Sequence, residues 1–215
     1  MNQNNMADAG ESLTSGDSVL VANIEKVKFR PAANENGLAY TSMKTAVSDG
    51  FNYSTTECVI TWNVNPVNDR PSFTASPLLI SVNEDFISTE TVTVTPLPVP
   101  ADEASQVVTY SIVPASVSFA NVSVNPSNGT VTITAKADSS GSAIIKIIAD
   151  DGQAINNTDT VAFTLTVAEV NDAPVFSIST TSVIVDEDFV TTETVTVTPG
   201  AVPANELSQI VTYSI

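Results

Sequence analysis

The stretch NEDFISTETVTVTP occupies residues 83–96, and a nearly identical stretch, DEDFVTTETVTVTP, occupies residues 186–199. The two copies are 103 residues apart, and residues 84–112 are identical to residues 187–215 at 22 of 29 positions without a gap. The sequences VNDRP, from Val67, and VNDAP, from Val170, keep the same spacing. A fixed period of this kind indicates a chain built from structural repeats. One repeat is 103 residues long, and residues 67–169 form a complete copy.

Short segments rich in Val, Ile and Thr follow one another within this copy. These residue types favour strands, and alternation of apolar with polar positions predicts a strand with one buried face. The dipeptide Asn128-Gly129 favours a tight hairpin. We predict seven strands, at residues 80–82, 91–97, 107–113, 119–124, 130–135, 142–149 and 161–167. Their number and spacing are typical of an all-β sandwich. The positions that we place in its core are Val92, Val94, Tyr110, Ile112, Val131, Ile133, Ala135, Val161, Phe163, Leu165 and Val167.

Parts of two further copies flank the complete one. Residues 18–66 correspond to about four later strands of a repeat, residues 170–215 to about three early strands of the next, and residues 1–17 to a polar N-terminal tail. At the 103-residue offset, Cys58, Ile60, Trp62 and Val64 align with the buried face of the last predicted strand. We therefore expect Cys58 to be a small buried apolar residue and Trp62 to lie in a core.

The charge and composition exclude several classes of function. The chain has a net charge of −17, so nucleic acid and anionic membranes are unsuitable partners, whereas multivalent cations are the natural counter-charge. It has no histidine and one cysteine, which excludes His-dependent nucleophilic catalysis and Cys/His zinc sites. No apolar segment is long enough to insert into a membrane, and the N-terminus lacks the features of a signal peptide. We expect a protein without enzymatic activity.

Four features together resemble the cadherin-like tandem repeats of large bacterial surface adhesins. They are the VND linkers, the Glu-Asp pair at the start of each repeat, the VTYSI strand, and the Asp-Gly that precedes the last strand. The resemblance covers the chain from about residue 13 onward. It implies tandem Ig-like, Greek-key sandwiches, calcium at the junctions between them, an extracellular or cell-surface location, and a role in adhesion or as a spacer. The animal cadherin linker is richer in acids than VND, so the resemblance at the linker is incomplete.

Acidic and amide side chains recur where a linker, the first strand and the preceding domain would meet. Oxygen atoms of this kind are the ligands that Ca²⁺ prefers, in sites with six to eight donors. On the family pattern, each linker Asn-Asp would join the Glu-Asp pair that follows it, with acids of the preceding domain completing the site. The alternative is that these residues only shape turns, since Asp and Asn bond readily to their own backbone. The candidate ligands are Asn68, Asp69, Glu84, Asp85, Asp102, Glu103, Asp151, Asn171, Asp172, Glu187 and Asp188.

Three functions remain open from the sequence. The first is a spacer whose partners are neighbouring repeats and an adhesion target that the sequence does not name. The second is a carbohydrate-binding module, which needs exposed aromatic platforms, whereas the aromatic residues make up 6% of the chain and several fall on predicted core faces. The third is a filament in which the early strands of one chain complete the later strands of another. The same organisation is also expected of a piece of a longer repeat array.

Overall fold

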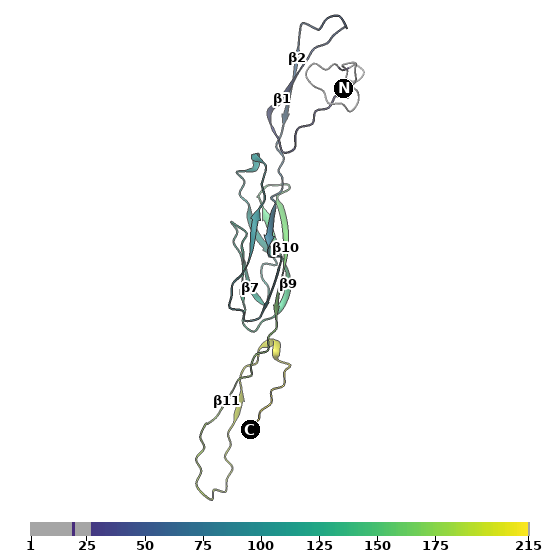
Figure 1. Cartoon of the computed structure of the whole chain (residues 1–215). Coiled ribbons are helices and arrows are strands. Elements are labelled where there is room, and N and C mark those ends of the chain that lie inside the picture. The colour runs from purple at the N-terminus through teal and green to yellow at the C-terminus, as the bar shows by residue number, and fades with distance from the viewer. Residues whose placement is uncertain (1–18, 20–26, 215) are drawn as a thin grey trace. The chain divides into compact units, whose positions relative to one another are not determined.

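The computed structural model describes residue 19 and residues 27–214, and the predicted tail at residues 1–17 lies outside them. Two compact units divide the chain, Met1–Val67 and Asn68–Ile215, and we describe each by itself (Figure 1). The described residues contain no helix with the length and apolar character needed to span a membrane.

The second unit contains a sandwich of two four-stranded sheets (Figure 1). One sheet has the order β3-β5-β8-β7 and the other β4-β10-β9-β6. Because successive strands cross between the two sheets, the topology is a Greek key of the Ig-like kind, and the prediction of an all-β sandwich is confirmed. The strands are β3 (Phe73–Ser76), β4 (Leu79–Asn83), β5 (Glu90–Pro96), β6 (Thr109–Val113), β7 (Ala120–Val124), β8 (Val131–Ala135), β9 (Gly141–Asp150) and β10 (Thr158–Ala168).

The structure has one strand more than the seven predicted within this span. The strand that was not predicted is β3: Pro77 lacks an N–H and so interrupts the opening segment, and the prediction at residues 80–82 covered only the part after it, β4. The part before it, β3, pairs with β5 in an antiparallel manner, whereas the part after it, β4, pairs with β10 in a parallel manner. The chain therefore crosses from one sheet to the other at Pro77. Because β4 runs parallel to β10, Glu84, which follows β4, lies at the end of the sandwich where β10 finishes.

The core forms where the alternating faces of the two sheets meet. Nine of the eleven predicted core positions are buried, while Ala135 and Val161 are half-buried. Burial of such side chains contributes roughly 1.5–3 kcal/mol each relative to exposure. The largest side chains that are completely enclosed are Phe163, Ile133, Ile145, Ile147, Leu165, Val92 and Val131.

The hairpin predicted at Asn128-Gly129 joins β7 to β8. Its turn is closed by bonds from Gly129 N to Asn125 O (2.8 Å) and from Asn125 N to Thr130 O (2.9 Å). Gly129 has φ +73°, and a Cβ there would lie 2.9 Å from side-chain atoms of Tyr110 and Val94. Both the backbone conformation and the close approach therefore require glycine at this position.

We expect Gly129→Ala to destabilise the sandwich by about 1–3 kcal/mol more than Gly152→Ala does. Gly152 has a similar φ of +77°, but no heavy atom lies within 4 Å of the place that a Cβ would take, so it bears only the backbone cost. Urea unfolding of both variants measures the difference. Equal destabilisation would show that the turn tolerates the extra carbon and that Tyr110 and Val94 move freely.

The first unit contains a two-stranded antiparallel sheet, β1 (Gly37–Thr45) with β2 (Cys58–Val64). It is the counterpart of β9–β10, because the pairing of Thr45 with Cys58 corresponds to that of Ile147 with Val161 at offsets of 102 and 103 residues. Of the four or so strands expected in residues 18–66, these two are formed among the described residues.

The predicted burial of Cys58 is wrong, and that of Trp62 is met only in part. Cys58 is exposed, and Ile60 is 44% exposed. Trp62 is half-buried, stacked on Phe29 at a centroid distance of 5.1 Å. The physical reason is that the face of β10 is covered by a second sheet, whereas among the described residues β1 and β2 form a sheet of only two strands.

Residues 170–214 repeat the opening of the sandwich in part. The short strands β11 (Phe176–Ile178) and β12 (Val197–Pro199) pair with Phe176 opposite Pro199. This register is that of β3 with β5, in which Phe73 lies opposite Pro96. The 3-10 helix η3 (Ala204–Glu206) likewise repeats η2 (Ala101–Glu103). The 103-residue period of the sequence is therefore a period of the structure as well.

Candidate functional site: an aspartate cluster at the second linker

Each Asn-Asp pair of a VND linker is bound by its own repeat. Asn68 donates its side-chain amide to Asp151 Oδ2 (3.0 Å), and Gln106 donates to Asn68 Oδ1 (2.8 Å). The backbone N–H of Asp69 donates to Glu103 Oε1 at 2.5 Å. Glu103 and Asp151 are both buried, and a buried carboxylate needs hydrogen-bond partners. These bonds supply them at the end of the sandwich where β10 begins.

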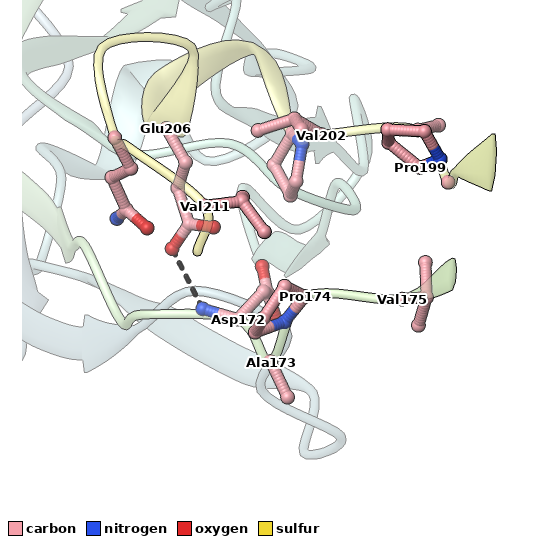
Figure 2. Close-up of a pocket in the computed structure, with 12 residues that line it drawn as sticks. Asp172, Ala173, Pro174, Val175, Pro199, Val202, Glu206 and Val211 are labelled. Carbon is pink, nitrogen blue, oxygen red and sulfur yellow. Dashed lines mark hydrogen bonds between the residues drawn. The ribbon is translucent and has the colours of Figure 1, made fainter. Parts of the chain in front are cut away.

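The second pair is held in the same way. The N–H of Asp172 donates to Glu206 Oε1 (2.6 Å), and Gln209 donates to Asn171 Oδ1 (3.1 Å). Figure 2 shows Glu206, from η3, pointing toward Asp172 across this bond. Glu206 is the counterpart of Glu103 at the 103-residue offset and is also buried. The backbone N–H of Asp172 is thus fixed, which leaves its carboxylate available to face the neighbouring acids.

Three aspartates come together at this second linker, and we call them the aspartate cluster: Asp85, Asp138 and Asp172. One carboxylate oxygen from each lies within 4.8 Å of the other two. Asp85 follows β4, Asp138 lies between β8 and β9, and Asp172 belongs to the linker. The N–H of Asp138 donates to Asp85 Oδ1 (3.1 Å), which links the two loops. Among the residues that the structure describes, this is the one group of three or more such side chains.

Further oxygen atoms surround the cluster. Glu84 is buried and accepts the N–H of Val170 (2.7 Å) and the side-chain amide of Asn205 (3.0 Å). These bonds connect the complete repeat, residues 67–169, to the linker that follows it and to η3. Asp172 Oδ2 and Asn205 Oδ1 are buried oxygen atoms without a hydrogen-bond partner. A buried acceptor without a partner costs free energy, so these two atoms mark a place where a donor or a cation is favourable.

The electrostatics of the cluster point in the same direction. The pKa of Asp172 is raised above its ordinary value of 3.8, first by desolvation and then by the negative charges of Glu206, Asp138, Asp85 and Glu84. Like charges held this close disfavour ionisation unless a counter-charge is present. A divalent cation would supply that charge, and carboxylate and amide oxygens are the ligands that Ca²⁺ prefers. The donor set therefore fits calcium.

The grouping of ligands expected from the sequence differs from the structure. We expected Asn68 and Asp69 to meet Glu84 and Asp85, but the first pair contacts Glu103 and Asp151 instead. The reason is geometric: β3 and β4 carry the chain along the length of the sandwich, so residues 68 and 84 lie at opposite ends. The Glu-Asp pair meets the linker of the following repeat.

The remaining predicted ligands lie outside the cluster. Glu187 and Asp188 are exposed in a turn after residue 186, and Asp102 is exposed at η2. Sequence reasoning missed Asp138, Asn205 and Glu206. The 103-residue offset from Asp102 and Glu103 could have found the last two, whereas Asp138 follows a strand in the unremarkable sequence KADSSG and has no repeated signal.

No protein-family model matches the chain, and neither does any curated protein. Among solved structures, the chain is similar to human protocadherin-24 EC1-2, with 21% identity and a TM-score of 0.34, over 52% of this chain and 49% of that one. It is also similar to the human desmocollin-1 ectodomain, with 18% identity and a TM-score of 0.31, over 66% of this chain and 28% of that one. The chain thus spans about half of the first structure and less of the second. Its assignment to the all-β sandwiches rests on its own two sheets.

Proposed function

We propose that this chain is a non-enzymatic spacer segment of an extracellular or cell-surface protein, in which calcium stiffens the junction after the complete repeat. The observation that supports this most directly is the aspartate cluster, in which two loops of the sandwich and the linker bring three carboxylates within 4.8 Å. A cation bound there would join the sandwich to the next repeat through Asp172. Repeated modules with fixed junctions extend a surface protein in one direction.

The ligands would come from the aspartate cluster, with Asn205 and Glu84 as the nearest additional oxygen donors. Glu84 already accepts hydrogen bonds from Val170 and Asn205. The cation would therefore add to the contact between the complete repeat and the segment that follows it. Calcium in extracellular modules binds with dissociation constants of ~10⁻⁴–10⁻³ M. At a concentration ten times the dissociation constant, the stabilisation is about 1.4 kcal/mol. Its effect would therefore be to limit motion at the linker, while the core maintains the fold.

A calcium titration tests the proposal. We expect calcium to raise the thermal midpoint by a few degrees, roughly 2–4 °C per kcal/mol for a chain of this size. The dissociation constant from isothermal calorimetry should agree with the one obtained from the dependence of the thermal midpoint on calcium concentration. Small-angle scattering should show a narrower range of conformations with calcium than with chelator. A midpoint and a scattering profile that do not respond to calcium would remove the ion from the proposed function.

A matched pair of variants locates the site. Asp85 and Asp188 occupy the same position in two repeats and share a backbone conformation, with φ of 58° and 62°. Only Asp85 belongs to the aspartate cluster. We therefore expect Asp85→Asn to weaken calcium binding by at least about tenfold, since it removes a charged ligand, and Asp188→Asn to leave it unchanged. Equal loss in both variants would place the ion elsewhere.

A further inference from the structure

The turn between β7 and β8 contains a pair of residues whose chemistry the proposed function does not use. Asn128 is exposed and is followed directly by Gly129. Because glycine has no side chain, its backbone nitrogen is the least hindered nucleophile that a preceding asparagine can meet. An Asn-Gly pair is therefore a place where asparagine can lose its side-chain amide. The chain has one other such pair, Asn36-Gly37.

The reaction at such a pair has two steps, and water is its one co-reactant. The nitrogen of Gly129 attacks Cγ of Asn128, the new Cγ–N bond replaces the bond to the side-chain nitrogen, and ammonia leaves with the proton of the glycine N–H. Water then opens the five-membered imide. Hydrolysis at Cγ gives aspartate at position 128. Hydrolysis at the backbone carbonyl gives isoaspartate, in which the main chain runs through Cβ and Cγ and is one atom longer.

The closed turn holds both reacting groups in other bonds. The N–H of Gly129 donates to Asn125 O (2.8 Å), so the attacking nitrogen keeps its proton in a hydrogen bond. The side-chain Oδ1 of Asn128 accepts the N–H of Thr130 (3.0 Å), which fixes the orientation of the amide. Cyclisation requires that both bonds break, and each broken bond costs free energy.

The turn cannot open without moving the core beneath it. The N–H of Tyr110, in β6, donates to Pro126 O (2.9 Å), which connects the turn to the other sheet. Gly129 is buried, and a Cβ there would lie 2.9 Å from side-chain atoms of Tyr110 and Val94. Both of these residues belong to the core. Cyclisation therefore depends on a local opening that is cooperative with part of the sandwich.

We propose that Asn128 is a masked deamidation site: the closed β7–β8 turn prevents cyclisation, opening of the turn permits it, and the isoaspartate product prevents the turn from closing again. Aspartate at this position keeps a side-chain oxygen for the N–H of Thr130, so the turn accommodates it. Isoaspartate lengthens the main chain next to Gly129, where the close approach to the core leaves no room. Isoaspartate thus records that a turn has opened. The proposal does not rest on calcium binding.

Incubation of the full chain in buffer and in unfolding urea, at one pH and temperature, tests the masking. Peptide mapping by mass spectrometry gives the deamidation rate at each Asn-Gly pair. We expect the two pairs to react at similar rates in urea. In buffer, Asn128 should react at least about tenfold more slowly than in urea, because only the open fraction reacts and tenfold corresponds to about 1.4 kcal/mol. A synthetic peptide of residues 124–131, measured in both solvents, corrects for the effect of urea on the chemistry.

A variant that weakens the turn tests the same point in buffer alone. Asn125 Oδ1 accepts the N–H of Ser127 (2.9 Å), so Asn125→Ala removes one bond of the turn and leaves the reacting pair in place. We expect deamidation at Asn128 to accelerate by about two- to tenfold, as the loss of one hydrogen bond implies. Asn52→Ala makes the same change at an exposed position outside the sandwich and should leave the rate unchanged.

The two products test the last part of the proposal. Asn128→Asp should unfold at the same urea concentration as wild type. Chains that carry isoaspartate, formed in urea and separated by chromatography, should refold with a lower midpoint or fail to refold. Three results would overturn the proposal: equal corrected rates in buffer and urea, an unchanged rate in Asn125→Ala, and a wild-type midpoint for the isoaspartate chains. None of them bears on the calcium site.

Discussion

Replacement of Ile145 by alanine is expected to lower the free energy of unfolding of the sandwich by about 2–5 kcal/mol. Ile145 lies in β9 and is completely buried. It pairs with Phe163 of β10, one of the largest enclosed side chains. Truncation removes buried methyl groups and leaves a cavity that the close-packed strands on either side of β9 cannot fill.

The neighbouring residue supplies the control. Ile144 is 64% exposed because it lies on the opposite face of the same strand. Ile144→Ala changes the same atoms and the same strand propensity, and it should cost well under ~1 kcal/mol. Urea unfolding at constant temperature gives both values. If the two substitutions cost the same, then β9 is not buried on one face, and the two-sheet sandwich is wrong.

The fold was predictable because the signal for it is local and repeated. Alternation of Val and Thr along residues 91–97 specifies both the strand and its buried face, and the 103-residue period shows which segments are equivalent. The strand β3 was missed because it is only four residues long and contains no Val or Ile. Its place in the other sheet depends on pairing with β5, which no local pattern encodes.

The burial of individual residues was predictable only where the surrounding strands are present. Phe163 and Trp62 follow similar patterns, yet Phe163 is enclosed and Trp62 is half-buried. A pattern indicates which face of a strand is apolar, whereas burial requires a second sheet to cover that face. The same limit explains why Cys58 is exposed.

The candidate site shows the same division between local and distant information. The sequence identified Asp85 and Asp172 as candidate ligands because acids recur at each repeat boundary. It assigned Asp85 to the wrong linker, since the direction in which β4 runs is a property of the sheet. Asp138 was missed because its loop approaches Asp85 only after β8 and β9 have packed. A site whose residues come from separate loops can be recognised mainly from the folded structure and not from the sequence.

Calcium affinity at the aspartate cluster should fall steeply as the pH is lowered through the raised pKa of Asp172. Desolvation and the neighbouring acids raise this pKa above 3.8, so in the ion-free protein Asp172 is protonated at a higher pH than an ordinary aspartate. A carboxyl with a raised pKa in the folded state stabilises that state at low pH, and this contribution is lost as the pH rises through the folded pKa. Calcium acts in the opposite direction, because it binds the ionised form. Below the pKa the affinity should drop on the order of tenfold per pH unit for each proton displaced.

Asp172→Asn separates this coupling from a general effect of acid. The substitution leaves in place the backbone N–H of residue 172, which donates to Glu206. The new side-chain amide neither ionises nor supplies a charged ligand. We expect its calcium affinity to be reduced by about tenfold or more at neutral pH and to depend less steeply on pH, because one titrating ligand is gone. Glu193→Gln, at an exposed position outside the cluster, removes the same charge and should keep both the affinity and its pH dependence. Calorimetric titrations at several pH values compare the three proteins. The calcium affinity of wild type and of Asp172→Asn could depend on pH with the same slope. Protonation of Asp172 would then not compete with calcium, and Asp172 would not be a ligand of the ion.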